Sequence, residues 1–363
     1  MKNTINVKNR ALAFDQISQN PTARLVLFIA VVTFVYLLLA SFTKIIFPED
    51  TSQSSSALLP YLKYAWKNSC ILLFIVSLVK LWMLTRESGS DPIFLHLSKN
   101  KKKVSQDIGQ LAVLFFVGLV TFAVFMYSYS TIKTRITAII PFHTDVFFME
   151  LDKALFLGNH PWEVFEWVYH FPLVIAVIDF IYDAWALLLV SVFLLSYIRK
   201  NQNPIERFRF PIALIITWFI GGNVAATLLS SAGPCYFYEV TGINNIYAGQ
   251  FEWLESVNTQ YELRALTYQK ILWDTHSSGS FGLGGISAMP SMHCASAFLF
   301  VLMAWKQKYL RIATILFFIT IFISSFLLGW HYAVDGLLAI PIAMIGWWAA
   351  KRISQKLAKP SRA

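Results

Sequence analysis

Long apolar runs dominate the chain, and short polar or basic segments separate them. The runs are continuous and do not alternate, so they indicate helices rather than the strands of a membrane barrel. Because a spanning helix needs about 20 apolar residues, the pattern predicts about eight transmembrane helices. They are expected over residues 25–42, 70–84, 108–129, 172–197, 212–231, 291–305, 312–328 and 331–350.

Two longer segments interrupt this series of spans. Residues 131–171 are too polar to cross a membrane but rich in Phe and Trp, which favours an interfacial segment. Residues 232–289 are polar and Gly-rich, and they are expected to form a long loop on the outer face. We therefore expect an all-α integral membrane protein with N-terminal helices and a basic loop over 1–130, followed by a second region over 131–363.

The composition agrees with a membrane protein. Hydrophobic residues make up 56% of the chain and charged residues 14%, and the mean hydropathy is +0.56, whereas soluble domains carry about 25% charged residues. A net charge of +10 can indicate a nucleic-acid partner, but here the basic residues lie between apolar runs. The positive-inside rule explains them better: if both termini are cytoplasmic, the cytoplasmic segments hold most of the 30 Lys and Arg residues.

Two short motifs in the last third of the chain carry polar side chains suited to chemistry. In Pro290-Ser291-Met292-His293, Ser291 is a typical N-cap residue, so His293 is expected at the mouth of the sixth span. His331 and Asp335 begin the eighth span and are four residues apart, which places them on one helical face. In the eight-span topology His293 and His331 both lie at the outer face, with Asp335 one turn deeper.

A neutral imidazole beside a carboxylate is a good nucleophile. Asp335 can accept the Nδ1–H of His331, and His293 can give a proton to a leaving oxygen. The free N–H groups of the helix that starts at Ser291 suit a phosphate. The pattern predicts phosphoryl transfer through a phosphohistidine, without a metal or other cofactor. Three alternatives stay open: a structural polar cluster, a metal-binding facial triad, and a proton path in a non-catalytic transporter or scaffold.

The pattern Pro-Ser-x-His, one span, then His-x-x-x-Asp resembles the type-2 phosphatidic acid phosphatase superfamily over roughly residues 145–350. The resemblance implies a six-helix catalytic core in which His331 attacks phosphorus, Asp335 orients it and His293 protonates the leaving group. The wording is most similar to the branch of inositol phosphorylceramide synthases, and sphingomyelin synthases share the His-Tyr-x-x-Asp form. Three further stretches carry this similarity: residues 152–158, 161–162 and 233–234.

The chain lacks the cations of the soluble phosphatase pattern. Residues 230–234 contain neither the Lys nor the Arg-Pro pair, and residues 324–325 read Ser-Ser in place of Ser-Arg. Arg264 is therefore the main candidate for binding the substrate phosphate and Lys270 the second, because they are the only cations in the outer segment 232–289. The alternative is an ordinary salt bridge with Glu255, Glu262 or Asp274.

Asp179, Tyr182 and Asp183 lie one or two turns inside the fourth span, and their spacing places them on one helical face. Carboxylates within a membrane helix are costly, and they usually mark a functional site. We expect these side chains to line the cavity and to hydrogen-bond a hydroxylated head group or acceptor. Hydrogen bonding between helices, or an interfacial helix start, is the alternative.

Together these observations predict a membrane phosphotransferase that acts on a lipid phosphoester and passes a phosphoryl head group to an alcohol. The alternative is a lipid phosphate phosphatase that hydrolyses phosphatidate or a polyprenyl phosphate or diphosphate with water. The active site is expected to face the periplasm, the exterior or a lumen, and the short loops favour a bacterial inner membrane. No nucleic-acid partner is expected, and the sequence does not indicate a partner subunit.

Overall fold

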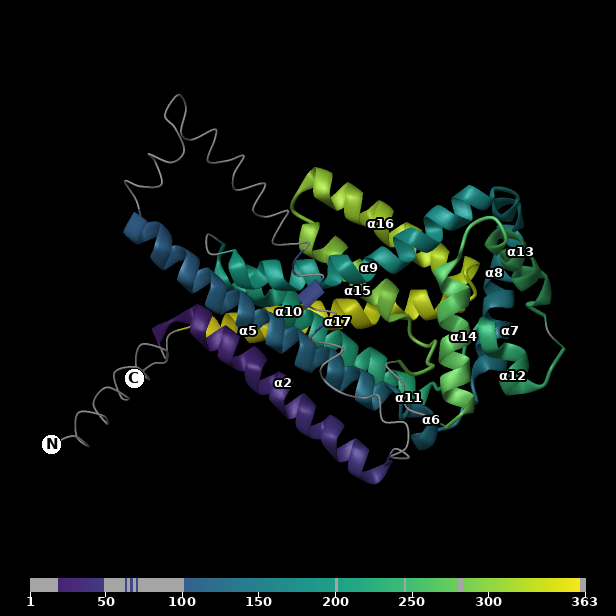
Figure 1. Ribbon diagram of the computed structural model, residues 1–363, viewed down its shortest axis with the longest axis horizontal. Coiled ribbons are helices and arrows are strands. Elements are labelled where there is room, and N and C mark those ends of the chain that lie inside the picture. Colours follow the sequence, from purple (N-terminus) through teal and green to yellow (C-terminus); the bar gives the residue numbers. More distant parts are fainter. Residues whose placement is uncertain are drawn as a thin grey trace.

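The computed structural model describes residues 19–48, 101–199, 202–244, 246–279 and 284–359, together with positions 63, 66, 67 and 70. Within these ranges every extended regular element is helical (Figure 1), which confirms the predicted all-α class. The α-helices are α2 (Pro21–Ile46), α5 (Lys101–Lys133), α6 (Ile136–Ile139), α7 (Asp145–Leu155), α8 (Pro161–Val164), α9 (Pro172–Ile198), α10 (Pro204–Phe219), α11 (Ala226–Leu228), α12 (Phe237–Thr241), α13 (Ala248–Asn258), α14 (Arg264–Ser277), α15 (Met292–Ala304), α16 (Lys308–Leu327) and α17 (Ala333–Ala358). Short 3-10 helices occupy Glu166–His170 (η2) and Pro234–Tyr236 (η4), and Ile220–Ala225 is a π-helical turn (η3).

Six helical segments in the described part of the chain are long and apolar enough to cross a membrane, which confirms a multi-pass membrane protein. They are Pro21–Ile46, Gly109–Ile139, Pro172–Ile198, Pro204–Leu228, Lys308–Leu327 and Ala333–Ala358. The predicted sixth span corresponds to α15, which is apolar but has only 13 residues. The predicted second span, residues 70–84, lies outside the described residues except for position 70.

Local sequence signals explain where the long helices begin and how they pack. Pro21, Pro172 and Pro204 each stand in the first turn of their helix, where a missing N–H costs no hydrogen bond. The helices α10 and α17 pack along each other, and Gly346 allows this because a Cβ there would collide with the Thr217 hydroxyl. The helix α2 packs on the outside against α5, α10 and α17.

The start of α2 lies beside the end of α17. The Arg24 guanidinium donates hydrogen bonds to the carbonyls of Lys359 (2.5 Å) and Ala358 (3.2 Å). Figure 1 shows both helix ends at the same side of the bundle, away from the short helices that cover the other side. The first and last described helices therefore open onto the same face.

The short helices at the other end of the bundle form what we call the cap: α7, α8, η2, α12, α13 and α14 (Figure 1). The expectation of a long loop over 232–289 is wrong, because much of this segment folds into η4, α12, α13 and α14. Its polar residues include buried glutamines that bind backbone carbonyls, and Gly residues end or separate short helices instead of signalling an open loop. Residues 131–171 extend α5 and then form short helices, none of which spans.

The helix α7 is amphipathic. Asp145, Phe148 and Asp152 are buried against the bundle, whereas Phe147 and Leu155 are exposed. Exposed apolar side chains on a helix at one end of a membrane bundle suit the interface between lipid and water. Two acids of α7, Asp145 and Asp152, thus face inward, and they are available to hold the ends of other segments.

We predict that Gln19 and Lys356, both exposed at one end of the bundle, face the same compartment, and that Lys270 on α14 faces the opposite one. Single cysteines at these positions, in a background without the three native cysteines, should react with a membrane-impermeant thiol reagent from the predicted sides only. If the cysteines at 19 and 270 were labelled from the same side of sealed vesicles, the arrangement of spans would be wrong.

Candidate active site

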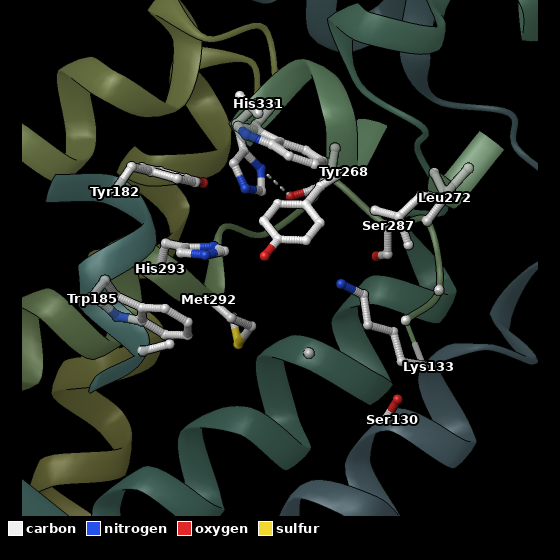
Figure 2. A pocket seen from close by; sticks show the side chains of 18 of the residues that line it. Ser130, Lys133, Tyr182, Trp185, Tyr268, Leu272, Ser287, Met292, His293 and His331 are labelled. Carbon is white, nitrogen blue, oxygen red and sulfur yellow. Dashed lines mark hydrogen bonds between the residues drawn. The ribbon is translucent and has the colours of Figure 1, made fainter. Parts of the chain in front are cut away.

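A cavity of about 640 Å³ opens where the ends of α5, α9 and α10 meet α14 and the start of α15. Most of its lining is apolar or aromatic, and Trp185, Trp218 and Met292 contribute large side chains. Figure 2 shows His293 and His331 pointing into this space from two sides. The cavity therefore combines an apolar wall with a few polar groups, as in sites that bind a ligand with a polar head group and an apolar body.

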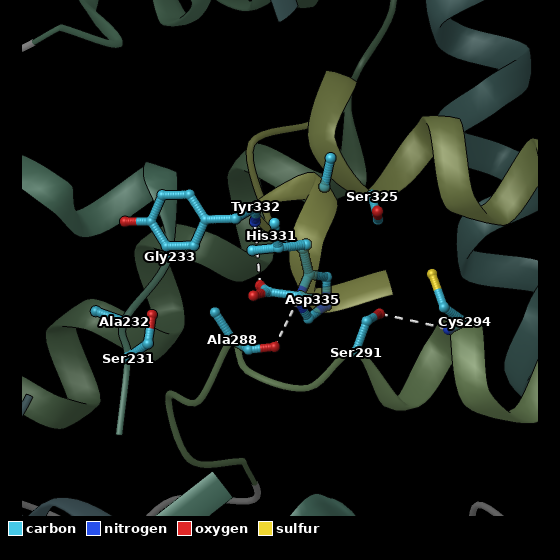
Figure 3. Close-up of polar contacts among 12 residues, drawn as sticks. Ser231, Ala232, Gly233, Ala288, Ser291, Cys294, Ser325, His331, Tyr332 and Asp335 are labelled. Carbon is cyan, nitrogen blue, oxygen red and sulfur yellow. Dashed lines mark hydrogen bonds and ion pairs between the residues drawn. The ribbon is translucent and has the colours of Figure 1, made fainter. Parts of the chain in front are cut away.

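The turn between α16 and α17 places His331 at the cavity. Its Nδ1 faces two oxygen acceptors, the Ala288 carbonyl at 2.7 Å and the Asp335 carboxylate at 3.2 Å (Figure 3). Because both neighbours can only accept, Nδ1 carries the proton, and the lone pair of the neutral ring lies on Nε2. This is the tautomer that a nucleophilic histidine requires.

Electrostatics also favour a neutral His331. Burial and the nearby Lys133 ammonium lower the pKa of His331 to about 3, although the bond to the Ala288 carbonyl raises it. The side chain lies in the turn ahead of α17 and is only 7% exposed. At neutral pH the ring is therefore uncharged, and its Nε2 is free to attack an electrophile.

Aromatic side chains hold the His293 ring, and no hydrogen bond from the described part of the chain fixes its tautomer. Its ring stacks on Tyr182, with centroids 4.4 Å apart and planes 18° apart, and lies 4.1 Å from the Trp185 ring. The His293 and His331 centroids are 6.2 Å apart. This separation leaves space for a tetrahedral group between the two imidazoles.

Ser291 links the two motifs through its backbone. Its N–H donates to the Asp335 carbonyl at 3.1 Å, which ties the start of α15 to the start of α17. Its hydroxyl accepts from the Cys294 N–H at 3.4 Å as the N-cap of α15 (Figure 3). The Ser291 hydroxyl therefore caps its own helix, and because it only accepts in this contact, its O–H can still donate; that Ser291 binds substrate stays a prediction.

Two carboxylates of α7 hold the segments that carry the site. Asp152 accepts from the N–H groups of Ala333 (2.7 Å) and Val334 (2.9 Å), the first residues of α17. Asp145 accepts from the Ala232 and Gly233 N–H groups and from the Tyr332 hydroxyl at 2.9–3.0 Å. We call these two residues the α7 clamp. Sequence reasoning did not identify them, although their spacing of seven places both on one helical face.

The α7 clamp acts at the start of α17 and at the segment that leads into η4. The first N–H groups of a helix have no intrahelical acceptor, and an acid there also meets the positive end of the dipole. Burial raises the pKa of Asp152 to about 7, while the bonds from Ala333 and Val334 lower it and Asp335 raises it. Asp152 thus accepts the N–H groups of Ala333 and Val334, while Asp335 of α17 itself accepts only the Tyr332 N–H.

Two buried glutamines and a tyrosine hold the same turn from the other side. The Gln250 amide on α13 donates to the carbonyls of Phe326 (2.6 Å) and Leu327 (3.0 Å), and the Gln269 amide on α14 donates to Leu328 (2.8 Å). The Tyr169 hydroxyl of η2 also donates to Leu327. These contacts close the carbonyl end of α16, so the cap fixes the turn that presents His331.

The predicted polar group on α9 lines the cavity, but two of its members have protein partners. The Asp179 carboxylate accepts from the backbone N–H groups of Arg264 (2.9 Å) and Ala265 (3.0 Å) and so caps α14. Asp183 forms an ion pair with the Arg264 guanidinium. Tyr182 stacks on His293, and its buried hydroxyl has no hydrogen-bond partner among the described residues. Bonding between helices, kept open as an alternative, is what the two carboxylates show.

The structure places the two predicted phosphate-binding cations differently from each other. Arg264 lines the cavity rim, but its partner is Asp183, not one of the acids nearest in sequence. Lys270 is exposed on α14 and does not line the cavity, because it points away from the side of α14 that Ala265 and Gln269 bury. A third cation, Lys133 at the end of α5, does line it (Figure 2). Lys133 was not singled out from the sequence.

The described residues contain no group of three or more His, Cys, Asp or Glu side chains arranged to hold a metal ion. Asp335 lies behind His331, on its Nδ1 side, whereas His293 lies across the cavity. The two imidazoles and the carboxylate therefore do not converge on one point as a facial triad does. They form a line of carboxylate, imidazole, open space and imidazole.

A family model described as the PAP2 superfamily matches residues 146–349, more than half of the chain. The chain belongs to the PAP2 superfamily. Neither curated proteins nor solved structures gave a match. The matched range includes the α7 clamp residue Asp152 and both histidine motifs. Members of the PAP2 superfamily are generally phosphatases or phosphotransferases, so this chain is a membrane enzyme of the kind that acts on lipid phosphoesters.

We predict that the α7 clamp stabilises this PAP2 protein. Changing Asp152→Ala leaves the buried N–H groups of Ala333 and Val334 without acceptors, so the free energy of unfolding should fall by about 1–3 kcal/mol. Amide exchange should accelerate at the start of α17. Both quantities can be measured on the protein in detergent by chemical unfolding and by hydrogen exchange with mass spectrometry.

Glu150→Ala is the matched control, because Glu150 is an exposed acid on the same helix. It should change stability by less than about 0.5 kcal/mol. Equal exchange rates at the start of α17 in Asp152→Ala and the unchanged protein would show that the carboxylate does not hold this helix.

Proposed function

We propose that this PAP2 enzyme is a metal-independent phosphotransferase that moves a phosphoryl head group from a lipid phosphoester to an alcohol acceptor through a phosphohistidine at His331. The observation that carries the proposal is the tautomer of His331: its Nδ1–H is held by Ala288 and Asp335, which leaves Nε2 as the nucleophilic atom beside His293.

In the first half of the reaction, His331 Nε2 attacks phosphorus, and the bond from phosphorus to the leaving lipid oxygen breaks. His293, in its protonated form, gives its proton to that oxygen. Asp335 stabilises the positive charge that develops on the His331 ring. In the second half, neutral His293 takes the proton of the acceptor hydroxyl, which attacks the phosphohistidine and releases His331.

The reaction class as a transferase rests on two features. The cavity wall is mostly apolar, which suits two lipid molecules as donor and acceptor better than water as the acceptor. The motif wording also resembles the inositol phosphorylceramide synthase branch and lacks the cations of the soluble phosphatases. The second candidate is a lipid phosphate phosphatase, in which water takes the place of the alcohol in the same cavity.

We also propose that the site faces the periplasm, the exterior or a lumen. The bundle end with Arg24 and the last turn of α17 carries many basic residues, and the positive-inside rule assigns such an end to the cytoplasm. A bacterial inner membrane fits the short loops. A donor lipid would then be processed in the leaflet away from the cytoplasm.

The test is product partition with a labelled lipid phosphoester and the purified full chain, with and without a lipid alcohol. The proposal predicts labelled acceptor lipid and little free phosphate or head group, with turnover depending on the alcohol. Release of the label at full rate without any acceptor would contradict the proposed transferase activity and favour a phosphatase.

Three variants and a chelator extend this test. His331→Ala and His293→Ala should lower turnover by about 10³-fold or more, whereas the exposed His143→Ala should leave it unchanged. A chelator should have no effect. Intact turnover in both active-site variants would contradict the enzyme mechanism as a whole.

A further inference from the structure

A phosphoester bound between His293 and His331 brings negative charge into an apolar cavity. Burying such a charge is costly unless a cation or several hydrogen bonds meet it. The Arg264 guanidinium is already paired with Asp183, and its side chain is 52% exposed at the rim. Of the two cations predicted from the sequence, Arg264 is therefore paired at the rim and Lys270 lies outside the cavity lining.

Lys133 is placed where that cation is needed. It is the last residue of α5, and its side chain extends into the cavity from the side opposite His293 (Figure 2). It is close enough to His331 to lower the pKa of that imidazole. Among the residues that the structure describes, no carboxylate lies within ion-pair distance of the Lys133 ammonium.

The acids around the cavity are committed to other partners. Asp179 accepts the backbone N–H groups at the start of α14, and Asp183 pairs with Arg264. Asp335 lies behind the His331 ring and contacts its Nδ1. Asp179 and Asp183 line the same cavity, but none of these acids forms an ion pair with Lys133 among the described residues, so its positive charge is left for an anionic ligand.

Close backbone packing fixes the position of Lys133. Gly285 passes directly over the end of α5: a Cβ on it would lie 2.6 Å from the Lys133 carbonyl oxygen and 2.7 Å from Thr134 Cα. The same linker leads on to Ala288, whose carbonyl holds His331. Close packing at Gly285 thus joins the backbone of Lys133 to the segment that fixes the nucleophile.

We propose that Lys133 binds the phosphate of the lipid substrate and supplies the cation that the family pattern carries elsewhere. This inference rests on the proposed function and deepens it. The ammonium donates hydrogen bonds to non-bridging phosphate oxygens while Nε2 of His331 attacks, and the three equatorial oxygens of the transition state carry the charge that it stabilises. A compact ammonium recognises the phosphate and not the head group or the lipid chain.

The first test compares three variants of the full chain in detergent with a lipid phosphoester. Lys133→Met should raise KM by about 10- to 100-fold, the factor for one charge-assisted hydrogen bond, and should raise the inhibition constant of inorganic phosphate by the same factor. Lys133→Arg should restore part of both. Lys153→Met, an exposed lysine on α7, should change neither.

A merely structural lysine would change stability without moving KM and phosphate inhibition together. If Lys133→Met kept both constants within twofold of the unchanged chain, the inference would be wrong.

The second test needs no substitution. An amine-reactive reagent modifies exposed lysines, and mass spectrometry measures the rate at each one. Inorganic phosphate should slow the modification of Lys133 and not that of Lys153. Equal rates at Lys133 with and without phosphate would overturn the inference. Protection of Lys133 in a protein that turns over no lipid phosphoester would instead uphold the inference and contradict the proposed function.

Discussion

The start of α17 rests on a carboxylate that α7 supplies, and the geometry of the site depends on that interaction. Asp152 accepts hydrogen bonds from the first N–H groups of α17, and Asp145 accepts one from the neighbouring Tyr332 hydroxyl. His331 and Asp335 stand on the two sides of this helix start. A shift of the start by a fraction of a turn would carry His331 away from the Ala288 carbonyl. The cap is therefore the support that aims the nucleophile.

The charged groups around the cavity also depend on their protein partners. The carboxylates near it have protein partners: Asp335 contacts the Nδ1 of His331, Asp179 caps α14, and Asp183 pairs with Arg264 at the rim. Two imidazoles and the Lys133 ammonium also line the cavity, within a mostly apolar wall. Interactions in a low-dielectric space are stronger than in water, so a cation without a carboxylate partner among the described residues favours a bound anion.

Much of the fold was open to prediction from sequence, because apolar runs report spans whatever their partners are. The spacing of His331 and Asp335 also predicted their contact, although His331 lies in the turn ahead of α17 and not in the helix itself. Other features depended on tertiary partners that no spacing reveals. Lys133 ends an apolar helix and resembles an ordinary flanking charge. Asp152 was visible only as part of a resemblance, and its partners lie 181 and 182 residues away.

The errors have physical reasons of the same kind. Residues 232–289 were expected to be a loop because polar and Gly residues usually indicate one, yet the buried amides of Gln250 and Gln269 anchor short helices to the α16–α17 turn. Lys270 was chosen because cations are rare in that segment, but rarity does not determine the face of a helix. Asp183 was correctly expected at the cavity, where its observed partner is Arg264.

The most direct measurement of the central claim is chemical trapping of the intermediate. The purified chain would be mixed with a phosphorus-labelled lipid donor without acceptor, quenched within milliseconds and mapped by mass spectrometry. The account predicts an acid-labile, base-stable label on His331 that is absent from His331→Ala. With Asp152 and Asp145 intact, the label should persist until an added alcohol releases it. A label on another residue, or turnover with no labelled enzyme under any quench, would contradict it.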